Sequence, residues 1–220
     1  MKKPALFTAI LVFSVCTAFG QNFYSIDNIA DSLKKNANAV LRFYNISYKR
    51  SSAAKYIKEV HYAISILNPK GKYASQLRIN YDRNSRVSDI KACLYGRNGD
   101  LQAKLKKKKI QDYAANNNYT LFSDHRQKLF KPAVSSYPYT IEYKYAIEHS
   151  GVVGFETWMP QKWFNVSVET SILKFNVPKE FDIKHMELNQ TFVKTEESTA
   201  KEKTYTWYTE GLKAIQYESH

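Results

Sequence analysis

The clearest pattern in the chain is an alternation of apolar and polar side chains over residues 140–149, which only Ala146 interrupts. Ile141, Tyr143, Tyr145 and Ile147 fall on one face of an extended chain, and the residues between them fall on the other. An alternation of period two predicts a strand with one buried face. Because such a strand needs a second layer over its apolar face, the pattern favours a β-sandwich.

Similar segments, separated by turn residues, recur along most of the chain. The strands they predict span 40–48, 55–67, 73–81, 87–95, 101–110, 129–130, 140–149, 155–158, 166–177, 183–194 and 203–208. Turn sequences at 68–72 and 96–100 predict that the strands on either side of each turn pair with one another. Residues 112–119 are polar and rich in Asn, and predict a loop or one helical turn. The apolar phase shifts within 166–177, which predicts a β-bulge near Thr170–Ser171.

The N-terminal part of the mature chain has a different period. Apolar residues at helical spacing predict one short helix within 25–37, with Ser25 as its N-cap. No βαβ alternation, internal repeat or linker divides residues 21–220. The sequence therefore predicts an all-β fold, a two-sheet antiparallel β-sandwich that is immunoglobulin-like in broad architecture. It spans residues 38–220 and follows a helical segment at 21–37.

Residues 1–20 have the features of a secretory signal peptide. Two lysines precede a short apolar run, and small residues at 18–20 predict cleavage before Gln21. A lipoprotein signal would use Cys16, but Val15 stands where a small residue is needed. The apolar run is too short for a permanent span, and no other run approaches membrane length. We therefore expect export to the periplasm or the extracellular space, with no transmembrane segment in the mature chain.

Positive charge is concentrated in the first half of the chain. The net charge of +13 falls to +11 once Lys2 and Lys3 are removed. Residues 21–120 contain 19 Lys and Arg against 7 Asp and Glu, whereas residues 121–220 contain 12 against 13. An anionic partner is therefore expected on the first half. Nucleic acid is not an expected partner for an exported protein.

The densest positive cluster is the lysine arm, which we define as residues 104–109. Its five lysines are Lys104, Lys106, Lys107, Lys108 and Lys109. One interpretation is a solvated hairpin arm, since lysines also protect exposed edge strands against aggregation. The other is contact with an anionic surface, such as lipid head groups or acidic polysaccharide. The five lysines are the candidate binding residues.

No combination of residues predicts a catalytic site. Cys93 is the one cysteine left after export, so no internal disulfide is expected, and its position within a strand favours a structural role. His61, His125 and His149 are available as partners in principle. Ser123-Asp124-His125 contains triad residue types, but sequence neighbours seldom meet in triad geometry, and a turn is the simpler interpretation. The histidines lack paired metal-ligand spacing, and we expect no cofactor or metal.

The three tryptophans offer an alternative kind of site. Trp158, Trp163 and Trp207 could form a sugar-stacking platform on one face of the sandwich. Aromatic residues in strands pack more often in the core, so the two interpretations stay open at this point.

Several ordered pieces of the sequence resemble a known domain. They are Asn38-Ala39-Val40, HYAISILNPKGK at 61–72, IKACLYGRNGDLQ at 90–102, FSDHRQKLFKPAV at 122–134, TIEYKYAI at 140–147 and PQKWFNVSVETSILKFNVP at 160–178. Over residues 36–217 the chain resembles the domain of unknown function that precedes a transglutaminase-like core in exported proteins of Bacteroidota-type bacteria. The resemblance implies a β-sandwich for which no activity of its own is known. In those proteins a core with Cys, His and Asp follows, and this sequence ends at 217–220, where that core would begin.

These observations predict an exported, non-catalytic β-sandwich module that acts as an interaction or scaffold domain. Its partner would be a protein or an envelope surface. Two alternatives remain. The chain could be the non-catalytic subunit of a split transglutaminase-like or peptidase-like system, with the catalytic core on another chain, or it could be a carbohydrate-binding sandwich.

Overall fold

The fold was analysed in a computed structural model that describes residues 23–52, 54–114, 124–151, 154–189 and 192–217. The predicted signal peptide at 1–20, together with Cys16 and Ser123, lies outside the described residues, as does most of the loop predicted at 112–119. Within the described ranges, no helix is long and apolar enough to cross a membrane.

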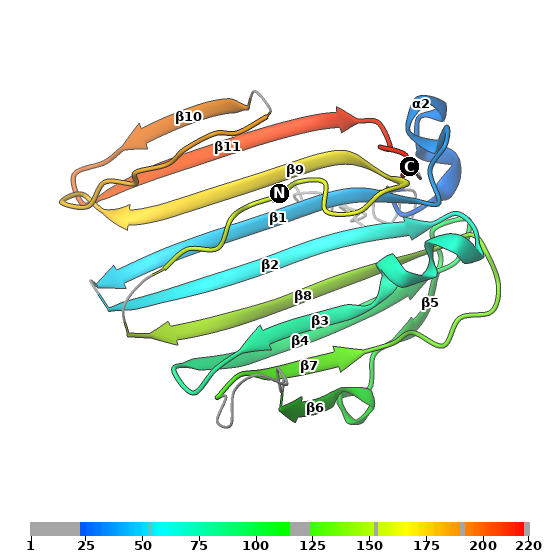
Figure 1. Cartoon of the computed structure of the whole chain (residues 1–220), viewed down its shortest axis with the longest axis horizontal. Coiled ribbons are helices and arrows are strands. Elements are labelled where there is room, and N and C mark those ends of the chain that lie inside the picture. The colour runs from blue at the N-terminus through cyan, green and yellow to red at the C-terminus, as the bar shows by residue number, and fades with distance from the viewer. Residues whose placement is uncertain (1–22, 53, 115–123, 152–153, 190–191, 218–220) are drawn as a thin grey trace, which may run out of the picture.

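Two β-sheets of unequal size make up the fold (Figure 1). The large sheet has eight strands in the order β10-β11-β9-β1-β2-β8-β4-β5, and the small sheet has three in the order β3-β7-β6. The large sheet consists of β1 (Ala39–Ser52), β2 (Lys55–Ile66), β4 (Ser85–Tyr95), β5 (Leu101–Lys104), β8 (Tyr139–Ser150), β9 (Val166–Pro178), β10 (Val193–Ser198) and β11 (Glu202–Leu212). The small sheet consists of β3 (Leu77–Tyr81), β6 (Gln111–Ala114) and β7 (Arg126–Phe130).

This architecture confirms the predicted all-β, two-sheet sandwich. All pairs of neighbouring strands are antiparallel except β1 and β9, which run parallel. The strands predicted from sustained alternation are recovered best. β8 matches the predicted 140–149 within a residue at each end, and β2 matches 55–67 equally closely.

The predicted pairing of 73–81 with 55–67 is wrong. Residues Pro69–Ser75 form the 3-10 helix η2, whose first turn is capped by the Asn68 side chain accepting from the Lys70 N–H. The helix carries the chain away from the large sheet, and β3 pairs with β7 instead. Gly71 permits this path, because a Cβ there would lie 2.3 Å from the Asn38 carbonyl oxygen.

Four other predicted elements differ from the structure. Residues 25–37 form two short pieces, the 3-10 helix η1 (Ile26–Asn28) and the single-turn helix α2 (Asp31–Lys34), although Ser25 does cap the first. The strand predicted at 101–110 ends at Lys104. Residues 155–158 are not a strand, and most of 183–194 precedes β10. Residues 101–110 and 183–194 do not sustain the alternation that identifies a strand, and 155–158 is too short to show it.

The predicted bulge near Thr170–Ser171 is wrong in its location. β9 keeps the same register offset from β1 on both sides of these residues, as the pairs Leu41–Val168 and Tyr44–Ser171 show. Register shifts lie instead on β1, one between Leu41 and Phe43 and one between Arg50 and Ser52. The bulged residue, Arg42, is only 2% exposed, and its guanidinium pairs with Glu169 at 2.6 Å and donates to the Ser25 carbonyl at 3.1 Å.

The main core lies on one face of the large sheet, and three parts of the chain cover it. The small sheet contributes Leu77 and Ile79, and coils between β8 and β9 and between β9 and β10 cross the rest of the face (Figure 1). Tyr143 connects the large sheet to the end of η2, because its hydroxyl donates to the Ser75 carbonyl at 2.6 Å, and its ring lies 6.4 Å from that of Phe130 on β7. Val40 lies between two residues of this core, so it faces the other side, where it packs with η1 and α2.

The small sheet is also held by a charged cluster. The carboxylate of Asp112 on β6 accepts from Tyr81 on β3 at 2.8 Å and from Arg126 on β7 at 3.1 Å, and it pairs with Lys128. These donors, with Lys128 making the largest contribution, lower the pKa of Asp112 to about 2. One ionised side chain therefore joins all three strands of the small sheet.

Candidate functional site

The lysine arm lies at the edge of the large sheet formed by β5. Lys104 ends β5, and Lys107–Lys109 form the 3-10 helix η3. The arm is folded, because the Leu105 N–H donates to the Ala92 carbonyl of β4 and the Ile110 N–H donates to the Lys107 carbonyl. These backbone hydrogen bonds therefore fix the position of the lysine arm beside β4.

Four of the five predicted lysines line one cavity of about 560 Å³. They are Lys104, Lys106, Lys108 and Lys109, and Lys107 is not among the lining residues. A fifth ammonium comes from Lys131, which follows β7 and which sequence reasoning missed. The only sequence signal for it was its place directly after the apolar pair Leu129–Phe130. We refer to this space as the lysine cavity.

The lysine cavity also has apolar walls. Ala92, Leu94 and Ile141 of the large sheet form one side, and the chain from Phe130 through Val134 forms the other. The site therefore lies where the edge of the large sheet meets the chain leaving the small sheet. A ligand that fits it combines negative charge with an apolar part.

The residues that line the lysine cavity do not neutralise its charge. Its lining contains neither Asp nor Glu. Within the described ranges, none of the five ammonium groups forms an ion pair, whereas the nearby Lys128 pairs with Asp112. Like charges held together without counter-charges attract an anionic partner.

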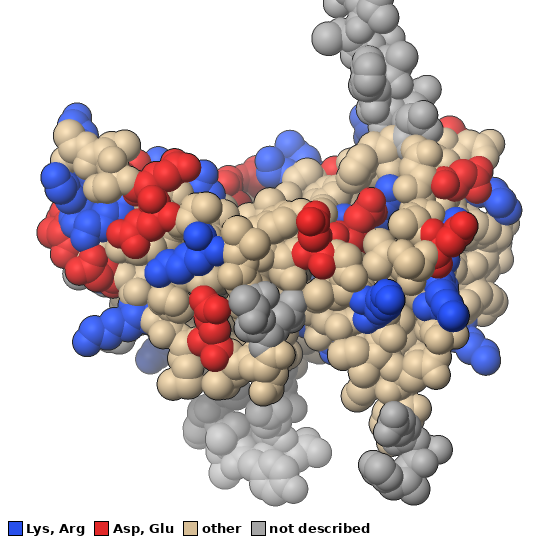
Figure 2. Space-filling view, turned by 90° about the horizontal axis from the view of Figure 1, so that it is seen from above, with Lys and Arg blue, Asp and Glu red and all other residues tan. Residues whose placement is uncertain are grey.

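The opposite edge of the large sheet has a different surface. Seen from the side of β10 and β11, Lys and Arg are interspersed with Asp and Glu (Figure 2). The nearly balanced composition of residues 121–220 predicts this mixture. The uncompensated positive charge is therefore a property of the β5 edge.

Cys93 lies beside a carboxylate. It is the cross-strand neighbour of Glu142, whose carboxylate lies 2.7 Å from His61 Nε2 and accepts from the Tyr95 hydroxyl at 2.8 Å. Burial, followed by the charge of Glu142, raises the pKa of the Cys93 thiol. The thiol is therefore protonated near neutral pH, and the imidazole of His61 is paired with Glu142.

The other candidate catalytic residues are dispersed. His149 Nδ1 lies 3.0 Å from Ser85 Oγ, and Asp124 pairs with Arg83 at 3.2 Å. In the part of the chain that the structure describes, no group of three or more His, Cys, Asp and Glu side chains is placed to hold a metal ion.

Replacing Cys93 by alanine tests the structural role of the thiol. We expect the free energy of unfolding to change by no more than about 1 kcal/mol, because the side chain is small and half-buried. We also expect maleimide to alkylate the folded wild type more slowly than the urea-unfolded chain, because the raised pKa leaves little thiolate. Rapid alkylation of the folded protein would show an activated thiol instead.

The three tryptophans do not form a common platform. Trp207 is 3% exposed and belongs to the core, where its indole N–H donates to Glu187 at 3.0 Å. Trp158 packs against Phe192. Trp163 lines a pocket on the core face of the large sheet.

The fold and the sequence together define the class of this protein. It is an all-β module, and the model of one family matches residues 53–216. The chain belongs to the DUF3857 family, described as "Domain of Unknown Function with solved-structure structure". A comparison with curated proteins gave no match.

Solved structures show where similar domains occur. One is a "putative protease" from Parabacteroides distasonis, with a TM-score of 0.70 and 11% identity. The match covers 83% of this chain and only 37% of that protein, so this chain spans little more than a third of its length. An M1 zinc metallopeptidase from Deinococcus radiodurans matches at 12% identity over 78% of this chain and 39% of that one, but its TM-score of 0.32 is too low to indicate a shared fold.

Proposed function

We propose that this chain is an exported, non-catalytic member of its family that docks on the anionic lipid surface of the cell envelope through the lysine cavity. The observation that carries the proposal is the set of five ammonium groups around an apolar space without a carboxylate in its lining. Export is supported by the signal-peptide pattern of residues 1–20.

The composition of the cavity favours lipid over a purely polar partner. Basic residues near an anionic membrane are each worth about 1 kcal/mol, so five can hold a protein at the surface. The apolar walls from Leu94, Phe130 and Val134 add a place for part of an acyl chain or glycerol backbone. An acidic polysaccharide would use the charge and leave these walls without a partner.

A second candidate function rests on the partial match to the larger protein. Because this fold occupies 37% of a "putative protease", the chain could instead serve as the non-catalytic subunit of a transglutaminase-like or peptidase-like system. The core would then be on another chain. An adjacent reading frame that encodes a Cys, His and Asp core, and co-purification of its product with this chain, would favour that role.

The docking proposal predicts steeply salt-dependent binding. We expect the chain from Gln21 onward to co-sediment with vesicles containing phosphatidylglycerol at low salt and to be released at high salt. Screening causes the release, since the Debye length falls from about 8 Å at physiological ionic strength to about 3 Å at 1 M. Phosphatidylcholine vesicles and an acidic polysaccharide resin are the controls.

Three results would contradict the lipid proposal. The first is equal binding to the neutral and the anionic vesicles, and the second is binding that persists at high salt. The third is retention on the polysaccharide resin without binding to anionic vesicles, which would assign the lysine cavity to glycans.

A further inference from the structure

A second pocket lies on the core face of the large sheet, apart from the lysine cavity. It has a volume of about 150 Å³ and opens between the small sheet and the coil that joins β8 to β9. The two spaces have no lining residue in common. We refer to it as the tyrosine pocket.

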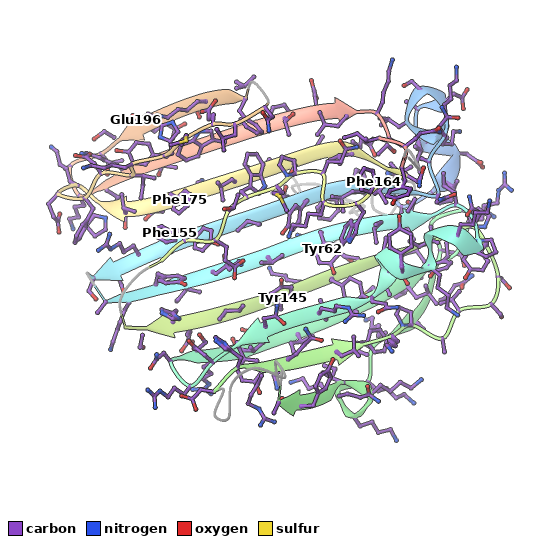
Figure 3. All side chains as sticks on the ribbon, in the orientation of Figure 1. Tyr62, Tyr145, Phe155, Phe164, Phe175 and Glu196 are labelled. Atoms are coloured by element: carbon purple, nitrogen blue, oxygen red, sulfur yellow. The ribbon has the colours of Figure 1, made fainter. Side chains whose placement is uncertain are left out.

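Three neighbouring strands supply the floor of the tyrosine pocket. Tyr44 of β1 pairs across the sheet with Tyr62 of β2, and Tyr145 of β8 lies on the next strand. Figure 3 shows Tyr62 and Tyr145 between the coil that bears Phe155 and the small sheet. The rings of Tyr44 and Tyr62 meet edge to face, with their centroids 5.9 Å apart, which is a favourable geometry for an aromatic pair.

The walls come from segments that are distant in sequence. Tyr73 of η2 is tied to the opposite wall, because its hydroxyl donates to the Phe164 carbonyl at 2.6 Å. That wall continues with Pro160, Lys162 and Trp163. Gln161 anchors it to the sheet by donating to the carbonyls of Val166 and Lys213.

Two cations reach the tyrosine pocket. The Lys162 ammonium donates to the Tyr44 hydroxyl at 2.8 Å, and Arg78 on β3 donates to the Gln76 side chain at 2.8 Å. The lining contains no carboxylate. Glu156 is close enough to act on Lys162, but its carboxylate is paired with Lys58 at 2.6 Å.

The polar atoms of the pocket are arranged to serve a ligand. Desolvation of the ammonium lowers the pKa of Lys162, although the residue as a whole is exposed. Burial also raises the pKa of Tyr44 to about 12, so its hydroxyl stays neutral and can hydrogen-bond. An anion bound at Lys162 would offset the cost of burying its charge.

The volume limits the size of the ligand. A protein cavity of about 150 Å³ accepts a molecule the size of benzene. Aromatic walls favour a flat ring or the apolar face of a sugar ring, and two cations without a counter-charge favour a carboxylate. We propose that the tyrosine pocket binds a single ring bearing a carboxylate, with the ring against Tyr62, Tyr145 and Trp163 and the carboxylate between Lys162 and Arg78.

Two classes of compound have a single ring that bears a carboxylate, aromatic acids and acidic sugars. Benzoate and glucuronate are the two probes, and benzamide and glucose are their neutral counterparts. Binding is followed by the indole N–H signals in proton–nitrogen NMR spectra, assigned with Trp163→Phe. Trp207, whose indole is bonded to Glu187 in the core, provides an internal control in every titration.

We expect a saturable shift of the Trp163 signal with at least one of the two carboxylates, with a Kd in the millimolar range. The matching neutral compound should bind at least tenfold more weakly. Lys162→Met should abolish this preference for the charged form, whereas Lys70→Met, a change at an exposed lysine near the pocket, should leave it intact. Binding of benzoate alone identifies an aromatic acid, and binding of glucuronate alone identifies an acidic sugar.

Equal binding of the charged and neutral compounds would overturn the proposal, and so would an unchanged preference in Lys162→Met. The absence of a saturable Trp163 shift with both carboxylates would also overturn it. Vesicle binding should be unaffected by Lys162→Met, because Lys162 lies outside the lysine cavity. The outcomes for the two sites are therefore independent.

Discussion

Changing Lys106, Lys107, Lys108 and Lys109 to glutamine is expected to weaken binding to anionic vesicles by up to about a thousandfold. Each lysine near an anionic surface is worth on the order of 1 kcal/mol, so the four together contribute up to about 4 kcal/mol. A change of about 1.4 kcal/mol is a factor of ten in affinity. Co-sedimentation at low salt measures the effect directly.

The structure refines this expectation. Lys107 does not line the lysine cavity, so restoring it to the quadruple variant should recover little binding. Restoring Lys108, which does line the cavity, should recover more. A difference between these two revertants would show that the cavity, and not the lysine arm as a whole, holds the ligand.

A second quadruple variant with the same net charge tests whether binding depends on the position of the lysines or only on their number. Lys174, Lys179, Lys184 and Lys201 are exposed residues of the second half of the chain, and changing them to glutamine removes the same charge. We expect this variant to keep most of its binding. Equal losses in both quadruple variants would mean that binding depends on net charge only. Unchanged binding with lower solubility in the lysine-arm variant would leave these lysines as protection for an edge strand.

Replacing Tyr143 by alanine is expected to lower the free energy of unfolding by about 3–5 kcal/mol, the range for truncating a large aromatic side chain in a core. Tyr143 is 0% exposed, its ring packs 5.2 Å from that of Tyr62, and its hydroxyl bonds to the Ser75 carbonyl. The Tm should fall by about 2–4 °C for each kcal/mol in a chain of this size. Urea and thermal unfolding provide the measurements.

Tyr143→Phe separates the contribution of the ring to the free energy of unfolding from that of the hydroxyl. It keeps the packing and leaves the buried Ser75 carbonyl without its partner, so we expect a loss of about 1–3 kcal/mol. Hydrogen exchange should quicken first in η2, which this bond ties to the large sheet, and in β3, which follows it along the chain. A loss below about 1 kcal/mol in Tyr143→Ala would show that the two sheets are joined mainly by other contacts.

The sequence alone determined the features that depend on neighbouring residues. The alternation in β2 and β8 is a local property, because side chains of a strand fall on alternate faces whatever the strand pairs with. The Ser25 cap and the turn at 96–100 are local for the same reason. The lysine arm could be recognised because its charges are consecutive in the chain.

Which strands pair and which side chains meet could be seen only in the tertiary structure. β3 pairs with β7 and β1 runs parallel to β9, and both pairings join segments far apart in sequence whose own patterns fit other partners. Arg42 is buried at a bulge because Glu169, 127 residues away, neutralises it there. Lys131 joins the lysine arm, and Tyr44, Tyr145 and Lys162 meet in one pocket, through contacts of the same long range. No periodicity within a segment specifies such contacts, because they depend on how separate elements pack.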